Sequence, residues 1–122
     1  MNESKPTLIL GASAKPNRYS YEAVGRLKAK GHPVYLLAKR ENEAHGEKIY
    51  AQPQELKNIH TVTMYLGARH QPEYYDYLIN LKPKRIIFNP GAENQELVEL
   101  CLQNGIEPEE ACTLVLLSIG EY

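Results

Sequence analysis

This sequence has few of the residues that mark a protein class directly, such as cysteine, tryptophan and an excess of one charge. Its 122 residues contain no tryptophan, one phenylalanine and two cysteines, and its formal net charge is -1 with 24% charged residues. A charge so close to zero excludes a global field that would draw the protein onto nucleic acid or an anionic membrane. We therefore expect any attraction for anions to be local.

The cysteines and the apolar runs exclude further classes. Cys101 and Cys112 form neither a Cys-x-x-Cys pair nor a Cys/His pattern with metal-ligand spacing. No apolar run approaches the ~20 residues of a membrane span, and residues 1–6 lack the apolar core of a secretion signal. These absences predict reduced thiols, no metal site, no membrane segment and a cytoplasmic location.

What the sequence does contain is an alternation of short apolar runs and helical patterns from end to end. The apolar runs predict strands at 7–10, 34–37, 61–66 and 85–88. The helical patterns predict helices at 21–30, 73–81 and 94–104. This order indicates one α/β domain over residues 1–122, with a doubly wound, mostly parallel sheet of about five strands and helices on both faces.

A few segments are less regular. Residues 46–50 favour a turn, and residues 54–57 favour a short helical piece after a proline. Ser20 is expected to cap the first helix and Gly31 to end it. Residues 108–110 are poor strand material because they combine a proline with two glutamates, and periodicity assigns residues 114–117 to neither strand nor helix.

The first strand runs directly into a small-residue turn of the kind found in nucleotide-binding proteins. Gly11 lets the backbone approach a pyrophosphate, and the helix that follows offers unpaired N–H groups and the positive end of its dipole. Lys15 and Arg18 add direct charge. The loop lacks the glycine spacing of the dinucleotide fingerprint, so an ordinary strand–helix connection with solvated basic residues is an open alternative.

Basic residues also follow the other strands, whose carboxyl ends face one crevice in a doubly wound sheet. Lys39 and Arg40 come after the second strand and Arg69 after the third. Together with the two cations of the first loop they predict a local anion site. NAD recognition favours Asp or Glu after the second strand, so the basic pair there predicts a ribose phosphate, which occurs in NADP and in coenzyme A (CoA).

Four segments in order resemble the stand-alone CoA-binding domain proteins, which are similar to the first domain of the succinyl-CoA synthetase alpha subunit. They are residues 10–20, 31–34, 61–65 and 89–94. The resemblance covers almost the whole chain and implies a Rossmann-like domain that binds CoA or an acyl-CoA. The residues it implies in binding follow the four strands and are Gly11, Ala12, Ser13, Lys15, Asn17, Arg18, Tyr19, Ser20, Ala38, Lys39, Arg40, Leu66, Gly67, Arg69, Asn89, Pro90 and Gly91.

The resemblance has two departures. Many relatives carry a Val-Asn-Pro-like segment where this chain has residues 37–40, and no histidine here maps onto the phosphorylated histidine of the synthetase's second domain. Ser13 and Ser20 lack a His/Asp pattern, so the sequence predicts binding without catalysis. Two alternatives remain open: an NADP-dependent oxidoreductase, and a regulatory subunit that presents acyl-CoA to a separate enzyme. The sequence leaves a protein partner or a homodimer equally open.

Overall fold

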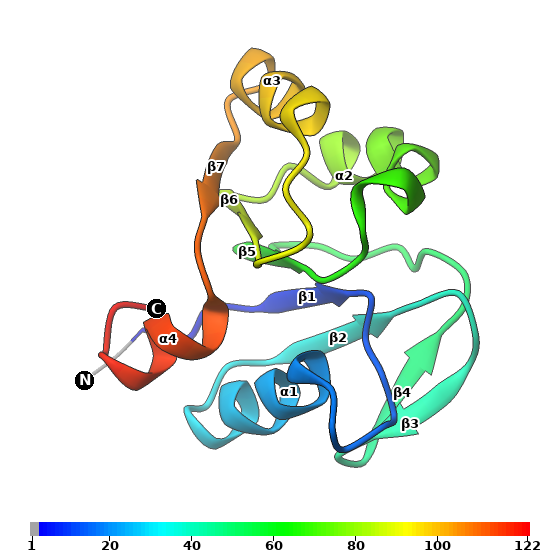
Figure 1. Cartoon of the computed structure of the whole chain (residues 1–122), viewed down its shortest axis with the longest axis vertical. Coiled ribbons are helices and arrows are strands. Elements are labelled where there is room, and N and C mark those ends of the chain that lie inside the picture. The colour runs from blue at the N-terminus through cyan, green and yellow to red at the C-terminus, as the bar shows by residue number, and fades with distance from the viewer. Residues whose placement is uncertain (1–2) are drawn as a thin grey trace.

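The computed structural model describes residues 3–122 as a sheet with helices on both sides (Figure 1). The strands are β1 (Thr7–Leu10), β2 (Val34–Leu37), β3 (Asn42–Ala44), β4 (Glu47–Tyr50), β5 (Thr61–Met64), β6 (Arg85–Phe88) and β7 (Glu107–Glu110). The α-helices are α1 (Tyr19–Ala29), α2 (Tyr75–Leu81), α3 (Gln95–Gln103) and α4 (Thr113–Ser118). Two short 3-10 helices, η1 (Ala68–His70) and η2 (Pro72–Tyr74), precede α2.

The sheet has the order β3-β4-β2-β1-β5-β6-β7. All neighbouring strands pair in parallel except β3 with β4. The predicted doubly wound α/β fold is confirmed as Rossmann-like, but the sheet has seven strands rather than about five. The chain leaves β1 towards β2 on one side and returns to β5 on the other. Ligands of open α/β sheets bind at such a change of direction.

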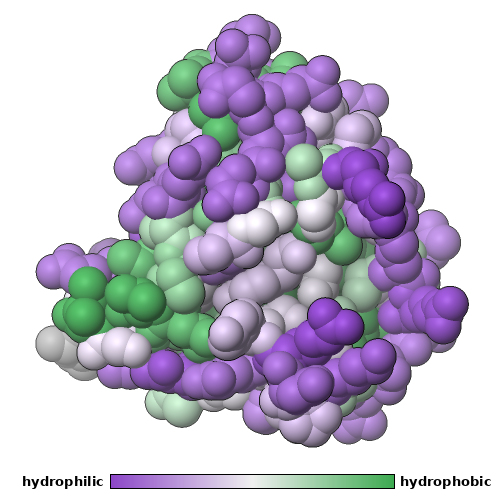
Figure 2. Space-filling model, in the orientation of Figure 1, coloured by the Kyte–Doolittle hydropathy of each residue, from purple (hydrophilic) through white to green (hydrophobic). Residues whose placement is uncertain are grey.

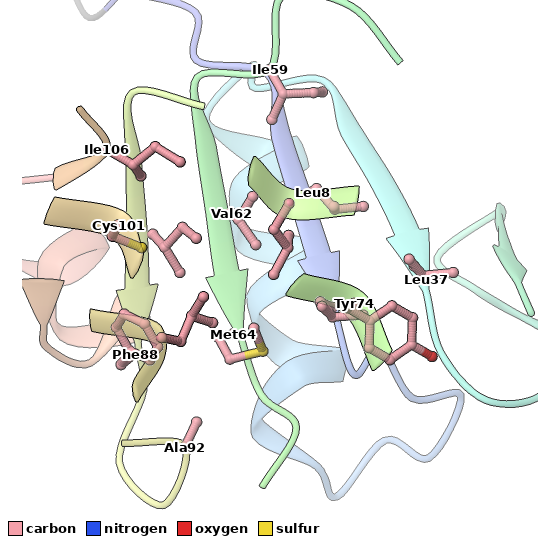
Figure 3. Packing of buried hydrophobic residues seen from close by; sticks show 14 residues of the cluster. Leu8, Leu37, Ile59, Val62, Met64, Tyr74, Phe88, Ala92, Cys101 and Ile106 are labelled. Atoms are coloured by element: carbon pink, nitrogen blue, oxygen red, sulfur yellow. The ribbon is translucent and has the colours of Figure 1, made fainter. Parts of the chain in front are cut away.

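Helices α1 and α4 cover one face of the sheet, and α2 and α3 cover the other (Figure 1). Successive side chains of β1 point to opposite faces. Ile9 accordingly packs in a cluster with Leu27 of α1, while Leu8 packs with Leu78 of α2 and Leu97 of α3. Figure 3 shows the second cluster, which fills the space between β1, β5, β6 and the helices. Both clusters hold the central strands in place, and with them the loops at the strand ends.

Two of the strands that the sequence did not predict, β3 and β4, lie in residues 42–50. Where the sequence favours a turn at 46–50, the structure has β4, which pairs with β2 through Ile49 and Tyr50 and with β3 on its other side. Only Ile49 of β4 is buried, so its alternation is too short to stand out in the sequence. The expected helical piece at 54–57 is wrong, because these residues form no regular element.

The remaining differences lie in the last strand and at the ends of helices. Residues 107–110 form β7 at an edge of the sheet, where a proline is tolerated because its missing N–H can face away from the neighbouring strand. Residues 114–117 belong to a helix, α4. Ser20 is not the cap of α1: Arg18 occupies the N-cap position, and Ser20 is buried in the first turn.

Candidate functional site

The carboxyl ends of β1, β5 and β6 meet at a cavity of about 450 Å³. The loop from β1 to α1 supplies most of its wall, and the segments after β5 and β6 supply the rest. Its lining residues are Gly11, Ser13, Lys15, Arg18, Tyr19, Ser20, Tyr65 and Pro90. The structure thus brings together three segments that are far apart in the sequence, at the point where the strand order reverses and the fold is expected to hold a ligand. Figure 2 shows the same face of the molecule as Figure 1, with its hydrophilic and hydrophobic surfaces.

Gly11 is required at the start of this loop by the fold itself. Its φ is +96°, and a Cβ built on it would lie 2.8 Å from the backbone nitrogen of Leu66 and 3.0 Å from the carbonyl carbon of Tyr65. Its backbone N–H donates to the carbonyl oxygen of Leu37 at 2.8 Å. Gly11 therefore makes room for the segment after β5, and the predicted approach of its backbone to a ligand stays a prediction.

The rest of the loop turns the chain into α1 and leaves donors exposed. The Ser13 hydroxyl accepts a hydrogen bond from the backbone N–H of Lys15, and the N–H of Arg18 donates to the carbonyl of Lys15. Arg18, the N-cap residue of the 11-residue helix α1, makes no capping hydrogen bond through its side chain. The first N–H groups of a helix have no partner within it, so those of α1 remain available to an anion beside the cavity.

The two cations of the loop are exposed. Within residues 3–122, neither Lys15 nor Arg18 takes part in an ion pair. Their charges are therefore not cancelled by a neighbouring carboxylate, and the positive end of α1 adds to them. Among the described residues, no carboxylate and no histidine lines the cavity. This arrangement suits a phosphate or another anion.

Tyr65 forms part of the cavity wall, although nothing in the sequence had singled it out. Its hydroxyl is buried and lacks a hydrogen-bond partner within residues 3–122. Burial raises the pKa of Tyr65 to about 12, in surroundings that include Thr63, Thr113 and Cys112. The phenol is therefore neutral at physiological pH. The run of β-branched and apolar residues at 61–66 indicated a strand, but it carried no sign that Tyr65 would face the first loop.

Asn89 supports the site from within the protein. It is 2% exposed, and its side-chain amide donates to the hydroxyl of Thr63 at 2.8 Å and to the carbonyl of Met64 at 2.9 Å. Its side-chain oxygen accepts from the backbone N–H of Thr113 at 2.9 Å. Asn89 therefore links β5, β6 and α4, and its side chain is committed to these bonds.

The cations after the other strands do not line this cavity. Lys39 forms an ion pair with Glu73, with 3.1 Å between Nζ and Oε1. Arg40 is exposed, and Arg69 donates from Nε to the Nε2 of His70 at 3.2 Å. Of the five basic residues predicted to form one rim, only Lys15 and Arg18 line this cavity.

The other predicted contact residues do not line the cavity. Ala12 is buried in the core. The N–H of Ala38 donates to the carbonyl of Tyr50, and the N–H of Gly91 donates to the carboxylate of Glu93. Those without a place on the cavity wall are Ala12, Asn17, Ala38, Lys39, Arg40, Leu66, Gly67, Arg69, Asn89 and Gly91.

Metal-binding and membrane-spanning features are absent from the part of the chain that the structure describes. No three histidine, cysteine or carboxylate side chains of residues 3–122 come together as a metal site would require. Over the same residues, every helix is too short or too polar to cross a lipid bilayer.

Comparisons with known proteins identify a family and a fold. A family model described as a CoA binding domain matches residues 5–118. A crystal structure described as that of an uncharacterized protein has a TM-score of 0.96 and 45% identity, and the match covers 99% of this chain and 100% of that one. A hypothetical protein from Pyrococcus horikoshii OT3 has a TM-score of 0.84 and 23% identity, covering 92% of this chain and 80% of that one.

A more distant likeness concerns the fold alone. Aspartate semialdehyde dehydrogenase II from Vibrio cholerae has a TM-score of 0.52 and 13% identity, and the match covers 96% of this chain and 41% of that one. No curated protein matches the chain.

Proposed function

Because the chain belongs to the family of CoA-binding domains, we propose that it binds CoA or an acyl-CoA at the carboxyl edge of its sheet, without catalysing a reaction on it. The observation that carries this proposal is the cavity at the N-terminus of α1, with two cations that no carboxylate of residues 3–122 neutralises. The pyrophosphate of CoA is the part of the ligand that such a wall would hold. The pantetheine arm is then free to extend over Tyr65 and Pro90, which complete the cavity.

Binding without turnover is supported by the chemistry of the wall. Its side chains are two hydroxyls, two cations, two tyrosines and a proline, beside the backbone of Gly11. Burial raises the pKa of the Tyr65 phenol to about 12, further from neutrality than its ordinary value of 10.0. General acid–base catalysis at neutral pH favours groups with a pKa near 7. These residues therefore serve better to bind and orient a ligand than to transfer protons.

An NADP-dependent oxidoreductase is the competing proposal, since NADP also carries a pyrophosphate and a ribose phosphate. The distant likeness to aspartate semialdehyde dehydrogenase II, at 13% identity, concerns the fold alone and does not favour this proposal. The two proposals differ in the ligand that they place in the cavity. They can therefore be separated by identifying the ligand directly.

Native mass spectrometry of the protein purified from cells without added ligand tests the proposal. A complex with the mass of CoA or an acyl-CoA is expected, and added CoA should form a one-to-one complex with any empty protein. A complex with the mass of NADP, or failure to bind CoA when it is added, would contradict the proposal. The Arg18→Glu variant serves as the site control, because its charge reversal should greatly weaken the complex.

A further inference from the structure

Lys39 differs from the other basic residues along the carboxyl edge of the sheet. Its ammonium lies 3.1 Å from the carboxylate of Glu73. Within residues 3–122, the remaining cations of this edge, which are Lys15, Arg18, Arg40 and Arg69, form no ion pair. A carboxylate therefore neutralises one of these five cations, at the position of Lys39.

This position is the one that reads the ribose of a bound nucleotide in doubly wound folds. Lys39 comes two residues after the end of β2, and Glu73 lies in η2, on the segment that follows β5. Because β1 lies between β2 and β5 in the sheet, the ion pair joins the two segments that flank the end of β1. The pair therefore stands where the adenosine half of a nucleotide bound at the first loop would lie.

Both partners extend from well-packed positions. Leu37 and Tyr74, each buried, belong to the same core cluster, and Figure 3 shows them at the same end of the sheet. Burial raises the pKa of the Tyr74 phenol, Glu73 raises it further and Lys39 lowers it, so both charges lie near this ring. The charged side chains themselves are 48% and 60% exposed. A ligand can therefore reach the pair, while the backbone on each side stays in place.

We propose that Glu73 sets the preference of this site for the substituent on the adenosine ribose, an inference that rests on the proposed function. Its carboxylate cancels the charge of Lys39 and repels a phosphate, whereas it can accept hydrogen bonds from ribose hydroxyls. A ribose phosphate can bind the ammonium of Lys39 only by competing with the carboxylate of Glu73. The carboxylate of Glu73 therefore lowers the ratio of the affinity for CoA to the affinity for dephospho-CoA.

The test is a calorimetric titration of the protein with CoA and with dephospho-CoA, which lacks the ribose phosphate. Glu73→Gln keeps the size of the side chain and removes its charge. We expect the ratio of the two affinities to shift towards CoA by about fivefold at low salt, the scale of an exposed ion pair. Higher salt should reduce this shift, because exposed charges are screened.

Two further variants make the test specific. Asp76→Asn removes the same charge from an exposed position three residues further along, which makes no ion pair within residues 3–122, and should leave the ratio unchanged. In a Lys39→Gln background, Glu73→Gln should lose its effect, because the cation that it unmasks is gone.

An unchanged ratio in Glu73→Gln, or an equal shift in Asp76→Asn, overturns the inference while leaving CoA binding intact. If the unaltered protein binds neither ligand, the proposed function falls and this inference falls with it.

Discussion

Gly11 and Leu66 approach each other so closely that a single added carbon would force them apart: a Cβ on Gly11 would lie 2.8 Å from the backbone nitrogen of Leu66. The contact joins the end of β1 to the segment after β5, on the two strands between which the winding of the sheet changes direction. The backbone N–H of Tyr65 strengthens the same junction by donating to the carbonyl of Leu10 at 2.8 Å. The floor of the candidate site is thus part of the fold.

We expect Gly11→Ala to destabilise the protein by more than its backbone conformation alone would cost. A non-glycine residue in the left-handed region costs roughly 1–3 kcal/mol, and the contact with the backbone of Leu66 adds to this. Gly31→Ala is the matched control, because Gly31 has a φ of +86° and a Cβ added there would meet nothing within 4 Å. Urea unfolding of both variants gives the difference. An equal loss of stability would show that the close approach is not a constraint.

Lys15→Glu and Arg18→Glu should each weaken CoA binding about tenfold or more, since a charge-assisted phosphate contact contributes about 1.5–3 kcal/mol and screening reduces it. Lys57→Glu makes the same change in net charge at an exposed position off the cavity wall and should have little effect. Calorimetry with CoA decides this. A similar loss in Lys57→Glu would mean that only the overall field matters.

Asn89→Ala should cost roughly 2–4 kcal/mol of unfolding free energy, because it leaves the buried partners of the Asn89 side chain without their hydrogen bonds. These partners include the hydroxyl of Thr63 and the N–H of Thr113. Asn104→Ala makes the same substitution at an exposed position whose amide donates to the carbonyl of Leu100. Denaturant unfolding should show a much smaller loss there, and comparable losses would contradict the role assigned to Asn89.

Acidification should destabilise the protein through His32. Burial, followed by the charges of Lys5, Arg85 and Lys30, lowers the pKa of this imidazole from 6.5, and its Nδ1 accepts the backbone N–H of Lys5. The unfolded state therefore binds the proton more readily, and the stabilising contribution present above pH 6.5 is lost as the pH falls through the folded-state pKa.

Two measurements check this prediction. An NMR titration should give a midpoint for His32 below 6.5, and His32→Asn should flatten the decline in melting temperature on the acid side of that value. Burial also lowers the pKa of His60, so part of the decline in melting temperature at acid pH should remain in that variant. A midpoint at or above 6.5 would contradict the structure around His32.

The central strands and the first loop could be predicted from the sequence because their signals are local. Residues 7–10 and 86–88 form continuous apolar or β-branched runs, and the structure has the interior strands β1 and β6 there. Gly31, the expected end of the first helix, follows the C-cap of α1 with a φ of +86°. The sequence did not predict β3 and β7, because these strands are defined by hydrogen bonding to β4 and β6 and not by an apolar pattern of their own.

The composition of the site was harder to predict because it depends on contacts between distant segments. A lysine after the second strand indicated an open cation, and nothing in the local sequence showed that Glu73 would pair with it. Asn89 resembled a ligand contact because it follows a strand, but its side chain points into the protein, where it bonds to Thr63 and Thr113. Which side chains face the ligand is decided by tertiary packing.

The most direct test of CoA binding at this site is a calorimetric comparison of CoA and NAD on the unaltered protein. We predict that CoA binds more tightly, because the loop and the edge after β2 offer cations to an additional phosphate, whereas NAD recognition favours a carboxylate after that strand. Equal or tighter binding of NAD would contradict the assignment of the site to CoA.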